Sequence, residues 1–328
     1  MNAVALKNTI ITMLKNGLPV MLKGAPGVGK TDIVYQVKEE LKWDLIITHP
    51  VVSDPTDFKG LPGIVNGEAE FLPFGDLRRL IEAKKHTICF IDDIGQAPAV
   101  VQAAAMQLIL ARRVNGHVVS DKVVFIAATN RREDRAGVTG ILEPVKSRFA
   151  SILEFTVSVD DWVEWAMAND VPVELVAFIR FRPALLHTKG ATADIVNHPC
   201  PRTITYAGKL LKVGLRDVET LAGAIGEGAA SELVGFLKLY EQLPDIDALL
   251  LDPKNTSVPV DPASLYAVTM ALVHKATKDN LKRIMSYVKR MPTEFQVLFV
   301  KDAVRKDKSI QNTQAFIEWA VANKNVLL

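Results

Sequence analysis

A glycine-rich octapeptide near the amino terminus constrains this chain more than any other feature. It follows a short apolar run at Val20–Leu22 and opens a helical pattern at Thr31–Leu41. It matches the pattern G-x-x-x-x-G-K-[ST] and consists of Gly24, Ala25, Pro26, Gly27, Val28, Gly29, Lys30 and Thr31. A strand, loop and helix of this kind direct backbone N–H groups and the positive helix end at phosphate oxygens. The octapeptide therefore predicts an ATP site, with Lys30 on the β- and γ-phosphates and the Thr31 hydroxyl on Mg²⁺.

Short apolar runs recur through the first half of the chain and alternate with helical patterns. Runs of this kind, without an alternation of polar residues, are typical of parallel strands covered by helices on both faces. The order therefore predicts an α/β domain, a P-loop nucleotide-binding core with a parallel sheet. The further runs are Leu45–Thr48, Ile88–Ile91, Val123–Ala128 and Ile152–Phe155, and the further helical patterns are Ala5–Lys15, Leu77–Ala83 and Val100–Arg112.

From Val159 onward the strand patterns fade and helical patterns continue to the end. This change predicts two domains: a nucleotide-binding domain over residues 1–158, and an all-helical lid domain with extended C-terminal helices over residues 159–328. We expect ATP at their junction. The expected helices are Asp160–Ala168, Pro172–Arg182, Tyr206–Leu211, Asp217–Ile225, Ala229–Leu243, Ala263–Ala276, Leu281–Tyr287, Glu294–Arg305 and Asn312–Ala322.

A second apolar run ends in two acids. Asp92 and Asp93 directly follow Ile88–Ile91. A magnesium site beside the phosphate loop needs a carboxylate at the end of a neighbouring strand. Asp92 is therefore the predicted second metal ligand with Thr31, and Asp93 the group that polarises the attacking water.

Two Asn-Gly pairs predict hairpins within the first domain. Asn66-Gly67 and Asn115-Gly116 each lie between short apolar segments. Asn-Gly is the strongest two-residue hairpin signal, because both central positions need a positive φ.

Composition and charge narrow the class of protein. The 39 basic and 37 acidic residues leave a net charge of +2, which gives no general attraction to nucleic acid or anionic membranes. Two cysteines, Cys89 and Cys200, do not support a disulfide framework, and Cys89 lies in an apolar run typical of a buried thiol. There is no signal-peptide pattern, and no apolar run reaches the roughly 20 residues of a membrane span. We therefore expect a soluble, cytoplasmic protein.

These motifs and their order resemble the AAA+ ATPases, and among them the MoxR-type branch with its insertion in helix 2. The segment Asp57–Gly63 with its hairpin is similar to that insertion, and the Asn115-Gly116 hairpin to the family's pre-sensor-1 hairpin. Asn130 follows the fourth apolar run and resembles sensor 1, whose amide positions the hydrolytic water.

The resemblance also gives roles to two arginines. Arg148, within Ser147-Arg148-Phe149, resembles the arginine finger that reaches the γ-phosphate of a neighbouring subunit. Arg202, after Pro201, resembles sensor 2 in the lid. The resemblance implies Mg²⁺-dependent ATP hydrolysis in a homo-oligomeric ring, a hexamer. Such rings remodel or mature a partner protein, often one with a von Willebrand factor A domain.

The sequence departs from the family pattern in places. Asp93 stands where the family has Glu, one methylene longer, which predicts slow turnover. Arg131, Arg132 and Arg135 also follow sensor 1 and are alternative fingers. Phe58-Lys59-Gly60 fits either a substrate-threading pore loop or a phenylalanine packed under a turn.

Three functions remain open: a protein-remodelling ATPase, a DNA-associated motor or loader, and a slowly hydrolysing assembly scaffold. The segment Lys275–Lys308 holds 10 basic and 4 acidic residues. It fits a solvated helical face or a docking surface for an acidic partner or nucleic acid. Aromatic residues do not interleave usefully with these charges, which weakens the nucleic-acid reading.

Overall fold

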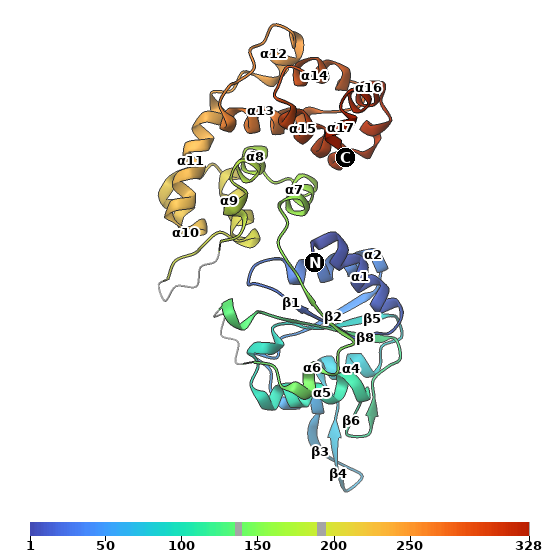
Figure 1. The fold of residues 1–328 in the computed structure, drawn as a ribbon. Helices are drawn as coiled ribbons and strands as arrows, with labels where there is room; N and C mark the ends of the chain where they lie inside the picture. The colour runs from blue at the N-terminus through green and yellow to red at the C-terminus, as the bar shows by residue number, and fades with distance from the viewer. Residues whose placement is uncertain (135–139, 189–194, 328) are drawn as a thin grey trace. The chain divides into compact units, whose positions relative to one another are not determined.

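The computed structural model describes residues 1–134, 140–188 and 195–327 (Figure 1). The chain divides into two compact units, the first over residues 1–157 and the second from residue 158 onward.

The first unit is built on a five-stranded parallel sheet, which confirms the predicted fold class. The strand order is β2-β5-β8-β1-β9, so β1 lies between two strands that come much later in the chain. Every residue of the central strands β5 and β8 is buried, which explains their unbroken apolar character. The strands are β1 (Val20–Lys23), β2 (Asp44–Thr48), β5 (Thr87–Ile91), β8 (Val123–Thr129) and β9 (Ser151–Glu154).

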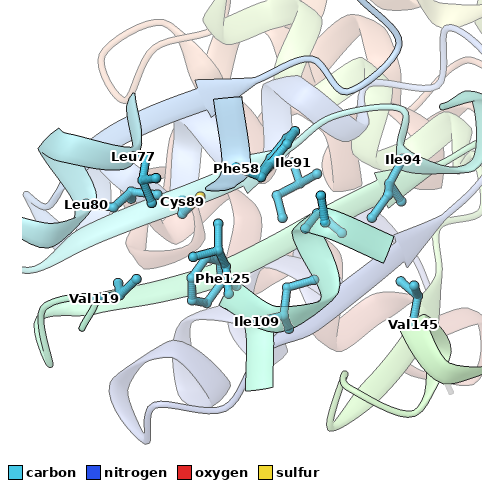
Figure 2. Packing of buried hydrophobic residues seen from close by; sticks show 14 of the residues in the cluster. Phe58, Leu77, Leu80, Cys89, Ile91, Ile94, Ile109, Val119, Phe125 and Val145 are labelled. Carbon is cyan, nitrogen blue, oxygen red and sulfur yellow. The ribbon is translucent and has the colours of Figure 1, made fainter. Parts of the chain in front are cut away.

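Helices cover both faces of this sheet. On one face α1 (Ala3–Lys15) and α2 (Lys30–Leu41) share an apolar cluster with Ile88 and Phe90 of β5. On the other face α4 (Gly75–Ile81), α5 (Ala99–Ala111) and α6 (Glu143–Lys146) share a cluster with Cys89 and Ile91. Successive side chains of β5 thus point to opposite faces of the sheet and pack into different apolar clusters, as the two-residue period of a strand requires. Figure 2 shows the second cluster.

Cys89 is a structural thiol, as its apolar surroundings predict. It is 2% exposed within the second cluster. Burial, aided by the nearby charge of Asp76, raises the pKa of the Cys89 thiol far above its ordinary value. The thiolate is the reactive form, so this cysteine is inert at neutral pH.

Both predicted hairpins form, and they lie next to each other. Asn66 and Asn115 have φ values of 52° and 46°, each followed by a glycine at 86° or 85°. The hairpin β3 (Leu61–Val65) and β4 (Glu68–Leu72) projects from the helical layer, and β6 (Arg113–Val114) and β7 (His117–Val118) lie beside it (Figure 1). Hydrogen bonds join Asn115 Nδ2 to Lys59 O at 2.9 Å and His117 Nε2 to Phe71 O at 2.8 Å.

A short helix that the sequence analysis missed precedes β3. It is α3 (Pro55–Lys59), begun by a capping box in which Asp54 and Asp57 bind each other's backbone. Its Phe58 is 4% exposed and packs into the second cluster. The pore-loop reading of Phe58 is therefore wrong, because a ring this deeply buried cannot grip a substrate.

The second unit is helical in its described residues, as predicted. Helix α9 begins five residues before the expected Tyr206, because Pro201 supplies a favourable first position. Helix α12 was missed, since its six residues are too few for a helical period. The helices are α7 (Val159–Ala168), α8 (Val173–Phe181), α9 (Pro201–Lys212), α10 (Val218–Ile225), α11 (Glu227–Glu241), α12 (Ile246–Leu251), α13 (Pro262–Lys275), α14 (Leu281–Val288), α15 (Thr293–Lys306), α16 (Gln314–Ala322) and α17 (Lys324–Leu327).

A buried ion network ties three of these helices together. Asp302 of α15 has no exposed surface and accepts hydrogen bonds from Arg180 of α8 at 2.9 and 2.5 Å. Arg305 bridges Asp302 at 2.9 Å and Asp160 of α7 at 2.9 and 3.0 Å. Because a buried carboxylate needs such partners, the network fixes how α7, α8 and α15 pack.

Several basic side chains of the segment Lys275–Lys308 form hydrogen bonds or ion pairs within the second unit. Arg305 belongs to the ion network, and Lys275 pairs with Asp247 at 2.9 Å. Arg290 binds the backbone oxygens of Pro253 and Thr256, and Lys306 binds three carbonyls at the end of α13. These four charges serve the fold, which favours the helical-surface reading over a docking surface.

Candidate nucleotide-binding site

The octapeptide forms a turn between β1 and α2 that glycines make possible. Gly27 and Gly29 have φ values of 72° and 101°, a region that other residues rarely adopt. A Cβ atom on Gly24 would lie 3.1 Å from the carbonyl oxygen of Phe155. The loop thus meets the geometric requirements of a phosphate-binding turn at a helix amino terminus.

Lys30 is held at the centre of this loop. Its side chain is buried, with 7% of the residue exposed. The ammonium group donates to Gly24 O at 3.1 Å, to Ala25 O at 3.0 Å and to Asn130 Oδ1 at 2.7 Å. An ammonium group has three N–H donors, so Lys30 exchanges at least one of these bonds when it meets a phosphate oxygen.

The predicted metal ligands lie together. Thr31 Oγ1 donates to Asp92 Oδ2 at 3.0 Å, and the backbone N–H of Asp92 donates to Thr48 O at 2.9 Å. A hydroxyl and one carboxylate fit Mg²⁺, which keeps several waters and phosphate oxygens in its shell. In the described part of the chain, no three His, Cys, Asp or Glu side chains form a cluster that could cage a metal. Thr31 and Asp92 would therefore hold the ion together with the nucleotide.

Asp93 and Asn130 lie beside Lys30, Thr31 and Asp92, and we call these five residues the constellation. Asp93 adopts a left-handed conformation with φ 54°, which turns the chain sharply after β5. Asn130 directly follows β8, is 8% exposed, and donates from Nδ2 to Asp93 Oδ1 at 3.1 Å. The amide of Asn130 therefore contacts both Lys30 and Asp93, and it lies where a water-positioning group is expected.

Arg148 lies at the opposite end of the sheet from this constellation. It comes just before β9, where Ala150 N donates to Pro19 O at 2.9 Å. The phosphate loop follows the carboxyl end of β1, so the length of that strand, roughly 3.3 Å per residue, separates the two. Arg148 is partly exposed, and within the described residues it forms no ion pair.

The alternative fingers differ in how they are bound. Arg131 makes two hydrogen bonds of 2.8 Å to Asp134, and these bonds raise the pKa of its guanidinium. It also donates to Glu154 at 3.4 Å, so its guanidinium group is bound to two carboxylates of its own unit. Arg132 is exposed, and Arg135 lies outside the described residues.

Arg202 is not part of the constellation within the first unit. It occupies the second position of α9 in the second unit and is exposed. Its predicted role as sensor 2 stays a prediction.

Gln102 is a buried polar residue that the sequence analysis did not single out. It belongs to α5, is 1% exposed, and makes three hydrogen bonds to backbone groups. The signal in the sequence is a pair of amides, Gln102 and Gln107, in an otherwise apolar helix, and it does not show which of them is buried or what it binds.

A match to a known protein family agrees with this geometry. Residues 19–149 match the AAA domain of the dynein-related subfamily. Among curated proteins, no relative matches the chain. The match supports an AAA domain over residues 19–149 and an ATPase as the enzyme class.

Among solved structures, the chain is similar to the Thermotoga maritima RuvB Holliday junction branch migration motor. The identity is 18%, the TM-score 0.43, and 87% of each chain is covered. It is also similar to NtrX from Brucella abortus, with 12% identity and a TM-score of 0.41, covering 91% of this chain and 67% of that one. Both TM-scores are below 0.5, so these likenesses are loose.

No helix in the described ranges has both the length and the apolar character that crossing a membrane requires.

Proposed function

We propose that this chain is an ATP-driven motor of the MoxR type that acts as a homo-oligomeric ring and remodels a partner protein. The observation that carries the proposal is the separation of Arg148 from the phosphate loop of its own unit. A cation at that edge has no ATP of its own to act on, whereas a second copy could bring it to a neighbour's nucleotide.

The hydrolytic step follows from the groups gathered around Lys30. Lys30 and the loop amides bind the β- and γ-phosphates, while Asn130 and Asp93 orient a water for in-line attack. Thr31 and Asp92 would hold Mg²⁺, which would neutralise charge on the phosphates when bound. The proton of the attacking water passes toward the carboxylate of Asp93.

Arg148 of a neighbouring copy would stabilise the charge on the γ-phosphate in the transition state. An arginine supplied in this way is worth about 10³–10⁵ in rate in other phosphoryl-transfer enzymes. By resemblance, Arg202 would stabilise the same charge from the lid. A lower turnover number in Arg202→Ala would support this role.

The paired hairpins offer a surface for the partner protein. Ile64 of β3 is 81% exposed and Phe71 of β4 is 41% exposed, and both project from the same face of the hairpin, because Phe71 pairs with Pro62, two residues before Ile64. Apolar side chains grouped on a projecting element are typical of a protein-binding surface. The MoxR resemblance suggests a client with a von Willebrand factor A domain.

A photo-crosslinking residue at position 64 tests this surface. We expect it to capture a client that also stimulates ATP hydrolysis, whereas the same residue at position 260, where Val260 is 92% exposed in the second unit, should not. If both positions capture the same proteins equally, the hairpins are not the client surface.

The DNA-motor alternative receives less support, because Arg290, Arg305 and Lys306 are used inside the second unit. Binding of labelled single-stranded and duplex DNA at 50 mM and 200 mM salt tests it. Affinity that falls steeply with salt would favour this alternative over the proposal.

A further inference from the structure

Gln102 joins two segments that come from different parts of the first unit. Its Nε2 donates to Ala97 O at 3.1 Å and to Gly140 O at 2.9 Å. Its Oε1 accepts the backbone N–H of Leu142 at 3.1 Å. One buried amide thus satisfies two backbone carbonyls and one backbone N–H.

The first segment is the turn that follows the acidic strand end. Gln96 N donates to Asp93 O at 2.9 Å, and Ala97 N donates to Ile94 O at 3.2 Å. Ile94 and Ala97 are completely buried in the cluster around α5. Gln102 therefore binds a buried turn that begins at Asp93.

The second segment leads to Arg148. Leu142 O accepts Val145 N at 2.9 Å, and Val145 O accepts Arg148 N at 3.1 Å. Val145 has no exposed surface, and it lies in the same cluster as Ile94 (Figure 2). Hydrogen bonds thus run from the Asp93 turn, through the side chain of Gln102, to the backbone of Arg148.

We propose that Gln102 is a positioning residue that fixes the arginine finger and links it to the acidic turn of the same subunit. This inference rests on the proposed function, because it requires Arg148 to act on a neighbour's ATP. In a ring, Gln102 would hold the finger that one subunit presents to the next. A shift of the Asp93 turn during hydrolysis would reach Arg148 through the same bonds.

Gln102→Glu is the most specific substitution. Glutamate has the shape of glutamine and still accepts the N–H of Leu142, but its carboxylate faces the carbonyls of Ala97 and Gly140 without a donor. The segment before Arg148 thus keeps its bond at Leu142 but loses the one at Gly140, and the turn after Asp93 loses the one at Ala97, while the side-chain volume stays the same. Gln107→Glu is the matched control, because Gln107 lies on the same helix and is exposed.

Mixed rings separate a finger role from a general structural role. Lys30→Ala subunits supply only a finger, and Arg148→Ala subunits supply only a loop, so their mixture should hydrolyse ATP at shared interfaces. Gln102→Glu is then added either to the finger donor or to the loop donor. We expect activity to fall about tenfold or more in the first mixture, since misplacement by about 1 Å can cost 100-fold, and to stay within twofold in the second.

Equal losses in both mixtures, or a larger loss on the loop side, would overturn the positioning role. Activity on the loop side also shows that the variant folds; should it not fold, Gln102→Met gives the same comparison. If the starting mixture of Lys30→Ala and Arg148→Ala is inactive although mixed rings form, the shared site itself is wrong. The role of Gln102 then fails with it, whereas a failure confined to Gln102 leaves the shared site intact.

Discussion

The side-chain amide of Asn130 donates to the carboxylate of Asp93 across 3.1 Å, although 36 residues lie between them in the chain. The oxygen of the same amide accepts from Lys30 at 2.7 Å. Parallel pairing of β8 with β1 and β5 brings the three residues to one edge of the sheet. Each can therefore be tested for a separate part of ATP binding and hydrolysis.

Removing the ammonium group of Lys30 should abolish turnover. Lys30→Ala takes away the cation that meets the β- and γ-phosphates, and we expect much weaker binding of a fluorescent ATP analogue. Lys23→Ala is the control, because Lys23 lies next to the loop but pairs with Glu154 at 3.0 Å on the surface. Wild-type hydrolysis by Lys30→Ala would mean that the loop is not the ATP site.

Asp93 should control hydrolysis without controlling binding. Asp93→Asn should bind ATP yet fail to turn it over in a single-turnover assay. The wild type should itself be slow, since a carboxylate about 1 Å short of its best position can cost about 100-fold. Unchanged turnover in Asp93→Asn would remove Asp93 from the mechanism.

Asp93→Glu tests whether reach limits the rate. The longer side chain should raise turnover, while its left-handed backbone, φ 54°, should cost about 1–2 kcal/mol of stability because only Asp, Asn and Gly adopt it readily. The change in turnover is measured as kcat, and the loss of stability as a lower melting temperature. A lower kcat would indicate that the site is fitted to aspartate.

A shared active site makes activity depend on concentration. Hydrolysis per subunit should rise as subunits associate, because a single copy has no finger at its own loop. Mass photometry run beside the ATPase assay would relate the rate to the oligomer. A monomer with a concentration-independent rate would exclude the shared site.

The buried network in the second unit should be sensitive to loss of its carboxylate. Asp302→Ala leaves Arg180 and Arg305 close together without their shared partner, and we expect a cost of about 3–5 kcal/mol in unfolding free energy. Urea unfolding followed by tryptophan fluorescence reports it, since three of the four tryptophans lie in this unit. Asp247→Ala, which breaks an exposed pair, should cost less than about 1 kcal/mol.

Stability of the second unit should depend on pH through Asp160. Burial raises the pKa of this carboxyl, but hydrogen bonds from Arg305 and Arg180 outweigh burial and hold it below the ordinary value. A lowered pKa contributes stability above the unfolded value, about 3.9, and that stability disappears as the pH falls through the folded value. The difference in unfolding free energy between wild type and Asp160→Asn should therefore shrink as the pH falls below about 4. A constant difference would show that the charge of Asp160 does not stabilise the unit.

Local features of the sequence determined the phosphate loop, the sheet strands, the hairpins and most helices. Each has a short-range physical cause: glycines that permit positive φ in the loop and turns, and apolar runs that must be buried on both sides of a sheet. Helix α3 and the burial of Phe58 could not be predicted from local sequence. A helix of five residues is too short to show a helical period, and the packing partners of Phe58 lie far away in the chain.

The sequence by itself determined which residues carry the phosphate-binding and acidic chemistry, because Gly24–Thr31 and Asp92-Asp93 are contiguous motifs. Only the tertiary structure decided how Lys30, Asn130 and Asp93 meet, and that Gln102 tethers the segment before Arg148. Those contacts cross between strands and helices that are distant in the chain. The register of the sheet and the packing of α5 fix such contacts, and no local pattern encodes either.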